Sequence, residues 1–214
     1  NLLPLPKNIT YEEGAAIPIV FITAWRMLTE RAKLQMGETL LIQGAGSGVG
    51  SAAIQIGKLI GAKIIACTST EKKAKQALDL GADEIINYKT ESISERVKEI
   101  TKKTGVNVIL EHVGDATWKE SIKCAAYHGR IVTCGATTGF KGETNLALLF
   151  AKQLSVLGST MGTLASFKKI LSLFEEGKLK PVLDRIMKLE DCKKAHELLE
   201  DGKQFGKIVL RVNE

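Results

Sequence analysis

The sequence lacks an apolar run long enough to cross a membrane and lacks any cysteine spacing typical of a metal site. The longest apolar stretch, from Gly14 to Trp25, has about a dozen residues, whereas a membrane-spanning helix needs about 20. The opening residues carry no signal-peptide pattern. The four cysteines show no CxxC spacing: Cys67, Cys124, Cys134 and Cys192. We therefore expect no membrane contact, and a reduced, cytoplasmic chain with small buried thiols.

Low-complexity tracts and clustered charge are also missing from the 214 residues. Lysine and arginine number 30 against 24 acidic residues, which gives a net charge of +6. These charges are dispersed, as in EKKAK at 71–75 and SERVKEITKK at 94–103, a pattern typical of solvated helix faces. We expect no nucleic-acid partner, because such a partner requires a clustered basic surface. The positive balance suits an anionic ligand such as a phosphate-bearing cofactor.

Groupings of side chains that attack or protonate a substrate are absent as well. No Ser–His–Asp or Cys–His arrangement stands out, and no pair of carboxylates does. His112 follows Glu111 at the end of an apolar run and can be an acid–base residue or a hydrogen-bonded structural residue. We favour the structural interpretation, so the sequence assigns no catalytic residue.

What the sequence does contain is a regular alternation of short β-branched runs and amphipathic segments. Strands are predicted at 39–45, 63–68, 84–88, 107–113, 130–136 and 154–160. Helices are predicted at about 49–60, 70–80, 92–103, 115–127 and 164–177. Because the strands are nearly continuous apolar runs, the pattern predicts an α/β fold with a doubly wound, six-stranded parallel sheet.

The two ends of the chain follow other patterns. Thr10 and Glu13 form a capping-box pattern, Pro18 ends that helix, and a further helix is predicted up to Gly37. After Gly177 the pattern becomes strand, helix, strand. We predict that the first residues and the tail belong to a second unit, which divides the chain into 1–30, 31–177 and 178–214.

The stretch LLIQGAGSGVGSAAIQIGKLIGA, residues 40–62, places glycines at 44, 46, 48 and 50 between a predicted strand and a predicted helix. Glycine permits a sharp turn and lets a pyrophosphate approach the backbone N–H groups at the positive end of the helix dipole. Gly46-x-Gly48-x-x-Ser51 nearly matches the dinucleotide fingerprint, with serine in the last place. The strand–loop–helix context therefore predicts a dinucleotide-binding site.

The end of the second predicted strand bears on which dinucleotide is bound. NAD-binding folds usually place an acid there, which binds the ribose 2′-hydroxyl. Here Thr68 and Ser69 occupy that place, and Lys72 and Lys73 follow Glu71. Hydroxyl and ammonium groups can bind a 2′-phosphate, which a carboxylate would repel. We therefore predict NADP(H), with NAD(H) as the alternative if the two lysines merely face solvent.

Several motifs together resemble the medium-chain dehydrogenase/reductase superfamily, and within it the quinone oxidoreductase-like branch. The matching stretches are TAWRML at 23–28, GETLLIQGAGSGVGSAAIQIGKLIGA at 37–62, LGADEIINY at 80–88, HGRIVTCGATTG at 128–139, LGSTMGT at 157–163 and FGKIVLRV at 205–212. They follow the order of the family over nearly the whole chain. The resemblance implies a Rossmann domain flanked at both ends by remnants of a GroES-like catalytic domain, which this chain mostly lacks.

Together with the glycine loop and the strand end, the resemblance implies these cofactor-binding residues: Thr23, Gly44, Gly46, Ser47, Gly48, Val49, Gly50, Thr68, Ser69, Lys73, Tyr88, Val113, Cys134, Gly135 and Ala136. Thr23 and the segment 134–136 would lie near the nicotinamide, and 46–49 would bind the pyrophosphate. Ser69, Lys73 and Tyr88 would surround the 2′-phosphate, with Val113 near the adenine.

The resemblance does not extend to a catalytic zinc. In zinc-dependent alcohol dehydrogenases of this superfamily, a cysteine ligand stands four residues before the threonine of the motif that matches TAW. Here that position is Ile19, and isoleucine has no atom that binds a metal.

The activity that the resemblance implies is a hydride transfer between NADP(H) and a small carbonyl, alcohol or quinone. This chain would be the cofactor-binding part of that oxidoreductase and inactive alone. We also expect a homodimer through the open sheet edge at 154–160. The alternative is a non-catalytic module that senses NAD(P).

Overall fold

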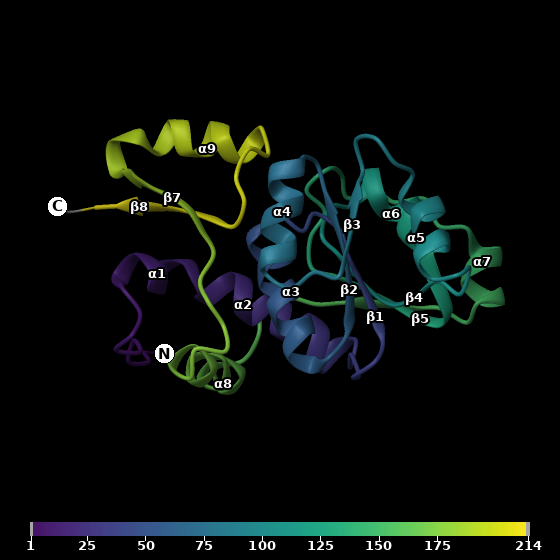
Figure 1. Cartoon of the computed structure of the whole chain (residues 1–214), viewed down its shortest axis with the longest axis horizontal. Coiled ribbons are helices and arrows are strands. Elements are labelled where there is room, and N and C mark those ends of the chain that lie inside the picture. The colour runs from purple at the N-terminus through teal and green to yellow at the C-terminus, as the bar shows by residue number, and fades with distance from the viewer. Residues whose placement is uncertain (1, 213–214) are drawn as a thin grey trace.

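The computed structural model describes residues 2–212 and builds most of them around a six-stranded sheet (Figure 1). Its strands are β1 (Thr39–Ile42), β2 (Lys63–Thr68), β3 (Glu84–Asn87), β4 (Val106–Glu111), β5 (Ala125–Thr133) and β6 (Ser155–Gly158). All neighbouring strands are parallel, in the spatial order β3-β2-β1-β4-β5-β6. The predicted doubly wound α/β fold is therefore confirmed, and its strand order reverses between β1 and β4.

The helices that follow these strands cover both faces of the sheet. They are α3 (Gly48–Ile60), α4 (Glu71–Asp79), α5 (Ile93–Ile100), α6 (Asp115–Cys124), α7 (Leu146–Ala151) and α8 (Leu164–Glu175). Leu40 and Ile42 of β1 pack into the core that α3, α4 and α8 cover, whereas Leu41 packs into the core that α5 and α6 cover. This burial on both faces explains why the strands lack polar alternation.

The N-terminal segment adds three helical elements: α1 (Tyr11–Ala16), α2 (Pro18–Trp25) and the π-helical turn η1 (Arg26–Arg31). Thr10 and Glu13 form the predicted capping box at the start of α1. Phe21 of α2 packs edge-on against Phe174 of α8, with 4.8 Å between the ring centroids. No helix among residues 2–212 is both long and apolar enough to span a bilayer.

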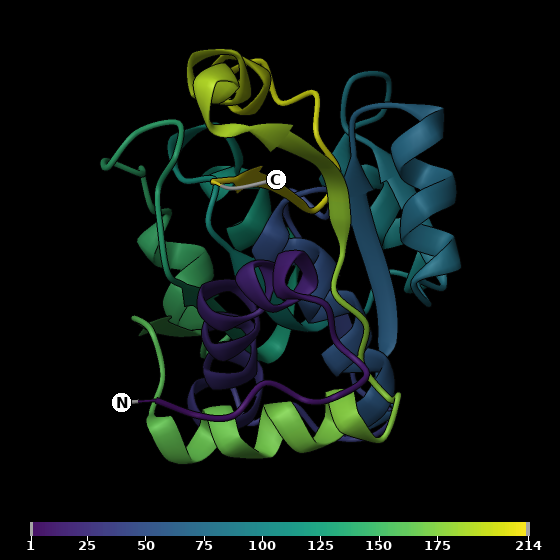
Figure 2. The same cartoon turned by 90° about the vertical axis from the view of Figure 1, so that its left-hand side faces the viewer.

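The C-terminal residues form a second, two-stranded parallel sheet of β7 (Leu183–Lys188) and β8 (Lys207–Arg211). The short η2 (Leu189–Asp191) and α9 (Cys192–Glu200) connect these strands, as the strand–helix–strand pattern predicted. In Figures 1 and 2 this sheet lies between α1 and α9. Arg211 of β8 pairs with Glu12 of α1 at 2.8 Å, so the last strand of the small sheet is tied to the first helix. The division into 1–30, 31–177 and 178–214 stays a prediction.

Several element boundaries differ from those predicted. The second N-terminal helix ends at Arg31 and does not reach Gly37, because Lys33 has a φ of 49°, which an α-helix does not accommodate. The helix predicted at 115–127 ends at Cys124, because Ala125 already pairs with β4. β1, β4 and β5 also end before the predicted positions, and the released residues form the loops at the carboxyl edge of the sheet.

Candidate functional site

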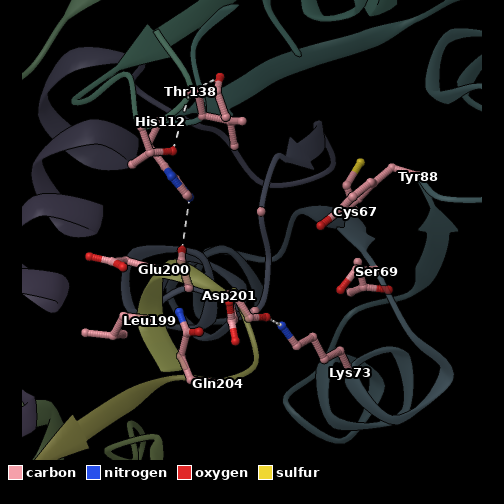
Figure 3. A pocket seen from close by; sticks show the side chains of 17 residues that line it. Cys67, Ser69, Lys73, Tyr88, His112, Thr138, Leu199, Glu200, Asp201 and Gln204 are labelled. Carbon is pink, nitrogen blue, oxygen red and sulfur yellow. Dashed lines mark hydrogen bonds between the residues drawn. The ribbon is translucent and has the colours of Figure 1, made fainter. Parts of the chain in front are cut away.

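A cavity of about 510 Å³ opens at the carboxyl edge of the large sheet, where the loops after β1, β2 and β4 converge (Figure 3). The glycine loop after β1 forms one wall, and the end of β2 with Lys73 of α4 forms the opposite wall. The loops after β4 and β5 and the turn between α9 and β8 complete it. Ligands of doubly wound α/β folds bind at this edge, next to the reversal of the strand order.

Two glycines of the loop occupy positions that no side chain could take. Gly44 has a φ of 59°, and a Cβ atom there would lie 2.9 Å from the ring of His112. A Cβ atom at Gly50 would lie 2.5 Å from the carbonyl oxygen of Gly44. Gly50 is therefore the glycine that lets α3 pack closely on the loop, one residue before the fingerprint position that the sequence assigned to Ser51. Ser51 is buried, and its hydroxyl donates to the carbonyl of Gly48 at 3.1 Å.

The first turn of α3 offers backbone donors to a ligand. Ser47 caps the helix, because its Oγ accepts the N–H of Gly50 at 2.9 Å. The N–H groups of Gly46, Gly48 and Val49 donate to no acceptor within the described residues. Free N–H groups at the positive end of a helix dipole attract an anion, and phosphate groups are the common occupants of such sites.

His112 lies across from the glycine loop, with its Nε2 3.0 Å from Ser47 Oγ. Because this oxygen already accepts the N–H of Gly50, the hydroxyl proton is free to point toward an unprotonated Nε2. Burial lowers the pKa of His112, which favours the neutral imidazole over the protonated one. His112 is hydrogen-bonded, as the structural interpretation predicted, and it also lines the cavity.

The loop after β4 is held in place by the buried carboxylate of Glu111. It accepts the N–H of Val113 at 2.7 Å and the N–H of Gly114 at 3.1 Å. It also accepts the hydroxyls of Thr117 at 2.9 Å and Ser121 at 2.7 Å. A buried carboxylate with this many donors fixes the loop and so fixes Val113 in the cavity wall.

The opposite wall carries groups suited to a phosphorylated ligand. The hydroxyl of Thr68 is buried and has no hydrogen-bond partner within residues 2–212. Lys73 donates from Nζ to the carbonyl oxygen of Gly202, in the turn between α9 and β8 (Figure 3). Burial lowers the pKa of Lys73, and the charge of Asp184 acts in the opposite direction. An unpaired hydroxyl and an ammonium group are both able to bind phosphate oxygens.

The cavity brings many of the predicted cofactor residues together. Those that line it are Gly44, Gly46, Ser47, Thr68, Ser69, Lys73, Tyr88 and Val113. Those outside its walls are Thr23, Gly48, Val49, Gly50, Cys134, Gly135 and Ala136. The glycine loop, the strand end and the tyrosine thus meet at one cavity, as their predicted roles require.

The residues outside the cavity lie in two places. Gly48 faces the side chains of Val20 and Lys207, and Thr23 is buried in α2. The segment 134–136 continues from β5 beside β4, and the N–H of Cys134 donates to the carbonyl of Glu111 at 3.3 Å. Burial raises the pKa of Cys134 to about 11, so its thiol stays protonated at neutral pH. The predicted places of Thr23 and 134–136 near a nicotinamide remain predictions.

The cavity also has walls that sequence reasoning missed. Thr137 and Thr138 follow β5, and the rule that ligands bind beyond strand ends could have pointed to them. The turn after α9 contributes Leu199, Glu200, Asp201, Gly202 and Gln204. Gly202 of this turn contacts Lys73, although the two residues are 129 positions apart in the sequence. No local sequence pattern indicates that they meet.

The described residues do not fit a catalytic zinc. No group of three or more His, Cys, Asp or Glu side chains within residues 2–212 is placed to hold a metal ion. Ile19 occupies the position of the cysteine ligand, is 61% exposed, and has no donor atom.

Comparisons with known proteins agree on one family. Residues 48–176 match the family described as zinc-binding dehydrogenase. The quinone oxidoreductase of Salmonella typhimurium is 33% identical over an alignment of 219 positions. The alignment covers 96% of this chain and 66% of that protein.

Two solved structures extend the comparison. One, described as an NAD-dependent alcohol dehydrogenase, is 43% identical with a TM-score of 0.95, and the match covers 100% of this chain and 62% of that one. The other, a crotonyl-CoA carboxylase/reductase in complex with NADP, is 25% identical with a TM-score of 0.92, covering 98% and 58%. The chain therefore spans less than two thirds of the length of each of these relatives.

Proposed function

Since this chain belongs to the zinc-binding dehydrogenase family and is the nucleotide-binding half of a medium-chain dehydrogenase/reductase, we propose that it binds the cofactor of an oxidoreductase. The proposed reaction transfers hydride between NADP(H) and a small carbonyl, alcohol or quinone. When bound, the nicotinamide supplies the hydride chemistry, while the protein binds and orients the dinucleotide. No step of the proposal uses a zinc ion, because Ile19 has no atom that could hold it.

The free N–H groups at the start of α3 are the observation that carries the proposal. Gly46, Gly48 and Val49 offer donors with no acceptor among the described residues, next to the 510 Å³ cavity. A Cβ atom at Gly46 would lie 3.3 Å from the side chain of Lys73 and 3.4 Å from that of Phe205, so any side chain at this position would crowd the space beside the N–H groups. These groups would hold the pyrophosphate, and Ser47 would keep the helix end in place through its bond to Gly50.

The preference for NADP(H) is a finer part of the proposal. Ser69, Lys73 and Tyr88 all line the cavity. The residue directly after Thr68 at the end of β2 is Ser69, whereas NAD-binding folds usually have an acid there to accept the ribose 2′-hydroxyl. The related structures are described with different cofactors, NAD for one and NADP for the other. The proposed preference for NADP(H) therefore rests on the residues of this chain.

We expect the 214-residue chain alone to bind the cofactor and to turn over little or no substrate. The relatives with enzyme names are longer, and this chain matches less than two thirds of each. Substrate-binding groups would come largely from the part that is not matched. Measurable turnover by the purified chain would contradict this part of the proposal.

Calorimetric titration of the purified chain with NADPH and with NADH tests the proposal. We expect Gly46→Ala to weaken the binding of both cofactors by about ten-fold, or about 1.4 kcal/mol, because the new methyl group fills the space beside the free N–H groups. Gly158→Ala is the matched control, since a Cβ atom at Gly158 meets nothing within 4 Å.

The outcomes separate the parts of the proposal. If the unsubstituted chain binds neither cofactor, or if Gly46→Ala binds both as well as Gly158→Ala does, the cofactor site is wrong. If NADPH and NADH bind with equal affinity, the site stands and the preference for NADP(H) is wrong.

A further inference from the structure

The turn between α9 and β8 is built to present a backbone carbonyl to Lys73. The N–H of Gly202 donates to Leu199 at 3.0 Å and the N–H of Lys203 donates to Leu198 at 3.0 Å, which closes the turn at the end of the helix. Gly202 has a φ of 61°, the left-handed conformation that glycine commonly adopts just past the end of a helix. Because the carboxyl end of a helix carries partial negative charge, an ammonium group binds there favourably. The Lys73–Gly202 bond therefore joins α4 to the C-terminal turn in the wall of the cavity.

Two cavities share the residues of this bond. One is the 510 Å³ cavity, and the other has a volume of about 410 Å³. Both are lined by Ser69, Lys73, Asp201 and Gly202. The smaller cavity is also lined by lysines of three different segments: Lys72, Lys89 and Lys203. A phosphate group that reached Lys73 would therefore sit at the boundary between the two cavities.

The carboxylates at this boundary act against such a phosphate. Glu200 and Asp201 line the larger cavity, and Asp184 lines the smaller one. Asp201 is paired with Lys203 at 2.7 Å, and both side chains are more than half exposed. The ion pair therefore controls how much negative charge the turn presents to a ligand beside Lys73.

We propose that the turn Glu200–Lys203 determines how strongly the chain prefers NADP(H) over NAD(H), because its Gly202 carbonyl competes with a 2′-phosphate for Lys73. The inference rests on the proposed cofactor site. NADH has a hydroxyl at this position and binds with the Lys73–Gly202 bond intact. NADPH must replace the carbonyl with its phosphate, at the end of a helix and beside Asp201, whose charge raises the cost while Lys203 lowers it.

Two exposed positions give opposite expected effects. We expect Asp201→Asn to tighten NADPH binding by about two- to five-fold, because it removes a repelling charge and frees Lys203, and Lys203→Met to weaken it by about the same factor. NADH binding should stay within error in both variants. The changes should shrink at high salt, because exposed charges are screened. A role of the turn in folding alone would show neither the opposite signs nor the salt dependence.

Titration of each variant with NADPH and NADH, and with 2′,5′-ADP and 5′-AMP as probes of the phosphate alone, tests the inference. The matched control is Glu176→Gln, which removes one carboxylate of a remote exposed pair, Lys178–Glu176 at 2.7 Å, and should change no affinity. If both cofactors bind but their affinity ratio is the same in all variants, the inference is wrong and the proposed function stands. If neither cofactor binds the unsubstituted chain, both are wrong.

Discussion

The imidazole of His112 and the hydroxyl of Ser47 face each other at 3.0 Å beside the glycine loop, and their bond depends on the charge of the imidazole. In the neutral tautomer that carries its proton on Nδ1, Nε2 accepts from the hydroxyl. Once His112 is protonated, Nε2 becomes a donor, and the hydroxyl has to turn away. The same side chain lies against Gly44, where a Cβ atom would collide with the ring. Protonation of this residue therefore acts on the glycine loop directly.

The stability of the chain should fall as His112 becomes protonated. Burial places the folded-state pKa of His112 below the ordinary 6.5, so the unfolded chain binds more protons at this site between the two values. The free energy of unfolding should therefore decrease as the pH falls from 6.5 through the folded-state pKa, and this contribution should be constant above 6.5. His112→Gln, which does not titrate, should reduce the loss of stability between pH 7 and pH 5.

Urea unfolding at several pH values measures this difference. His196→Gln, at an exposed position of α9, is the control. An equal pH slope for the unsubstituted chain and for His112→Gln would show that the imidazole of His112 is not responsible.

Single residues were predictable where one residue type has one physical role. The turn at the glycine loop and the Thr10–Glu13 capping box depend on local backbone geometry, so a few adjacent residues were enough to predict each of them. The Ser47–His112 bond was not predictable, because it joins residues 65 positions apart. The role of Gly50 was missed for a related reason, since its close neighbour is the carbonyl of Gly44 on the other side of the turn.

At the scale of elements, α3 shows how a glycine can be required at one position and replaceable at another. Gly50 and Gly57 are both buried in this helix. A Cβ atom at Gly50 would meet backbone, at 2.5 Å from the carbonyl oxygen of Gly44. A Cβ atom at Gly57 would meet the end of a side chain, at 2.9 Å from a methyl carbon of Leu40, which can rotate.

We therefore expect Gly50→Ala to destabilise the chain by about 2 kcal/mol, because backbone atoms must move to admit the methyl group. Gly57→Ala is the matched substitution in the same helix. Its smaller clash is offset by the helix propensity of alanine, worth about 1 kcal/mol over glycine, so the net change should be below about 1 kcal/mol. Urea unfolding of both variants is the measurement. A cost for Gly57→Ala as large as that for Gly50→Ala would refute the argument from close backbone packing.

Elements were predicted well where period and composition agree, and poorly where tertiary contacts set their ends. β2 spans Lys63–Thr68, the range predicted, because its apolar run is bounded by a turn on both sides. The π-helical turn Arg26–Arg31 had no sequence signal, and it is held by contacts of Arg26 and Arg31 with the carbonyls of Thr160 and Gly158. Such contacts exist only in the folded chain, so periodicity does not report them.

At the scale of the whole molecule, β6 is an edge of the large sheet, where its sequence range was expected. It pairs with β5 on one side, and Val156 is 44% exposed. An open edge strand is a template for pairing with a second copy. The homodimer remains a prediction.

Light scattering of the purified chain should give the mass of two copies, and Val156→Glu should shift it to one, because a buried carboxylate at the paired edge has no partner. Leu78→Glu, at a comparably exposed position of α4, should leave the mass unchanged. A monomeric mass for the unsubstituted chain at high concentration would reject the edge as an interface.

The arrangement of the whole molecule was predictable as far as the α/β alternation reached. The parallel, doubly wound sheet follows from that alternation together with the handedness of its crossovers, whereas the strand order does not, because the same alternation fits more than one order. The contact of the C-terminal turn with α4 does not follow from it, because the small sheet is placed by packing against α1 and the glycine loop. The sequence therefore located the glycine loop and the end of β2 with Lys73, but it did not locate the part of the cavity formed by the turn after α9.

The bond from the N–H of Gly206 to the carbonyl of Gly46, at 2.9 Å, has a consequence for the order of events during translation. The ribosome releases the large sheet first, so its strands can pair while the tail is still being made. The glycine loop gains its contact with Gly206, and Lys73 its carbonyl partner, only when the segment from Gly202 to Gly206 has emerged. A dinucleotide in the cell would therefore meet a finished pocket only after synthesis of this region has ended, too late to assist the earlier steps.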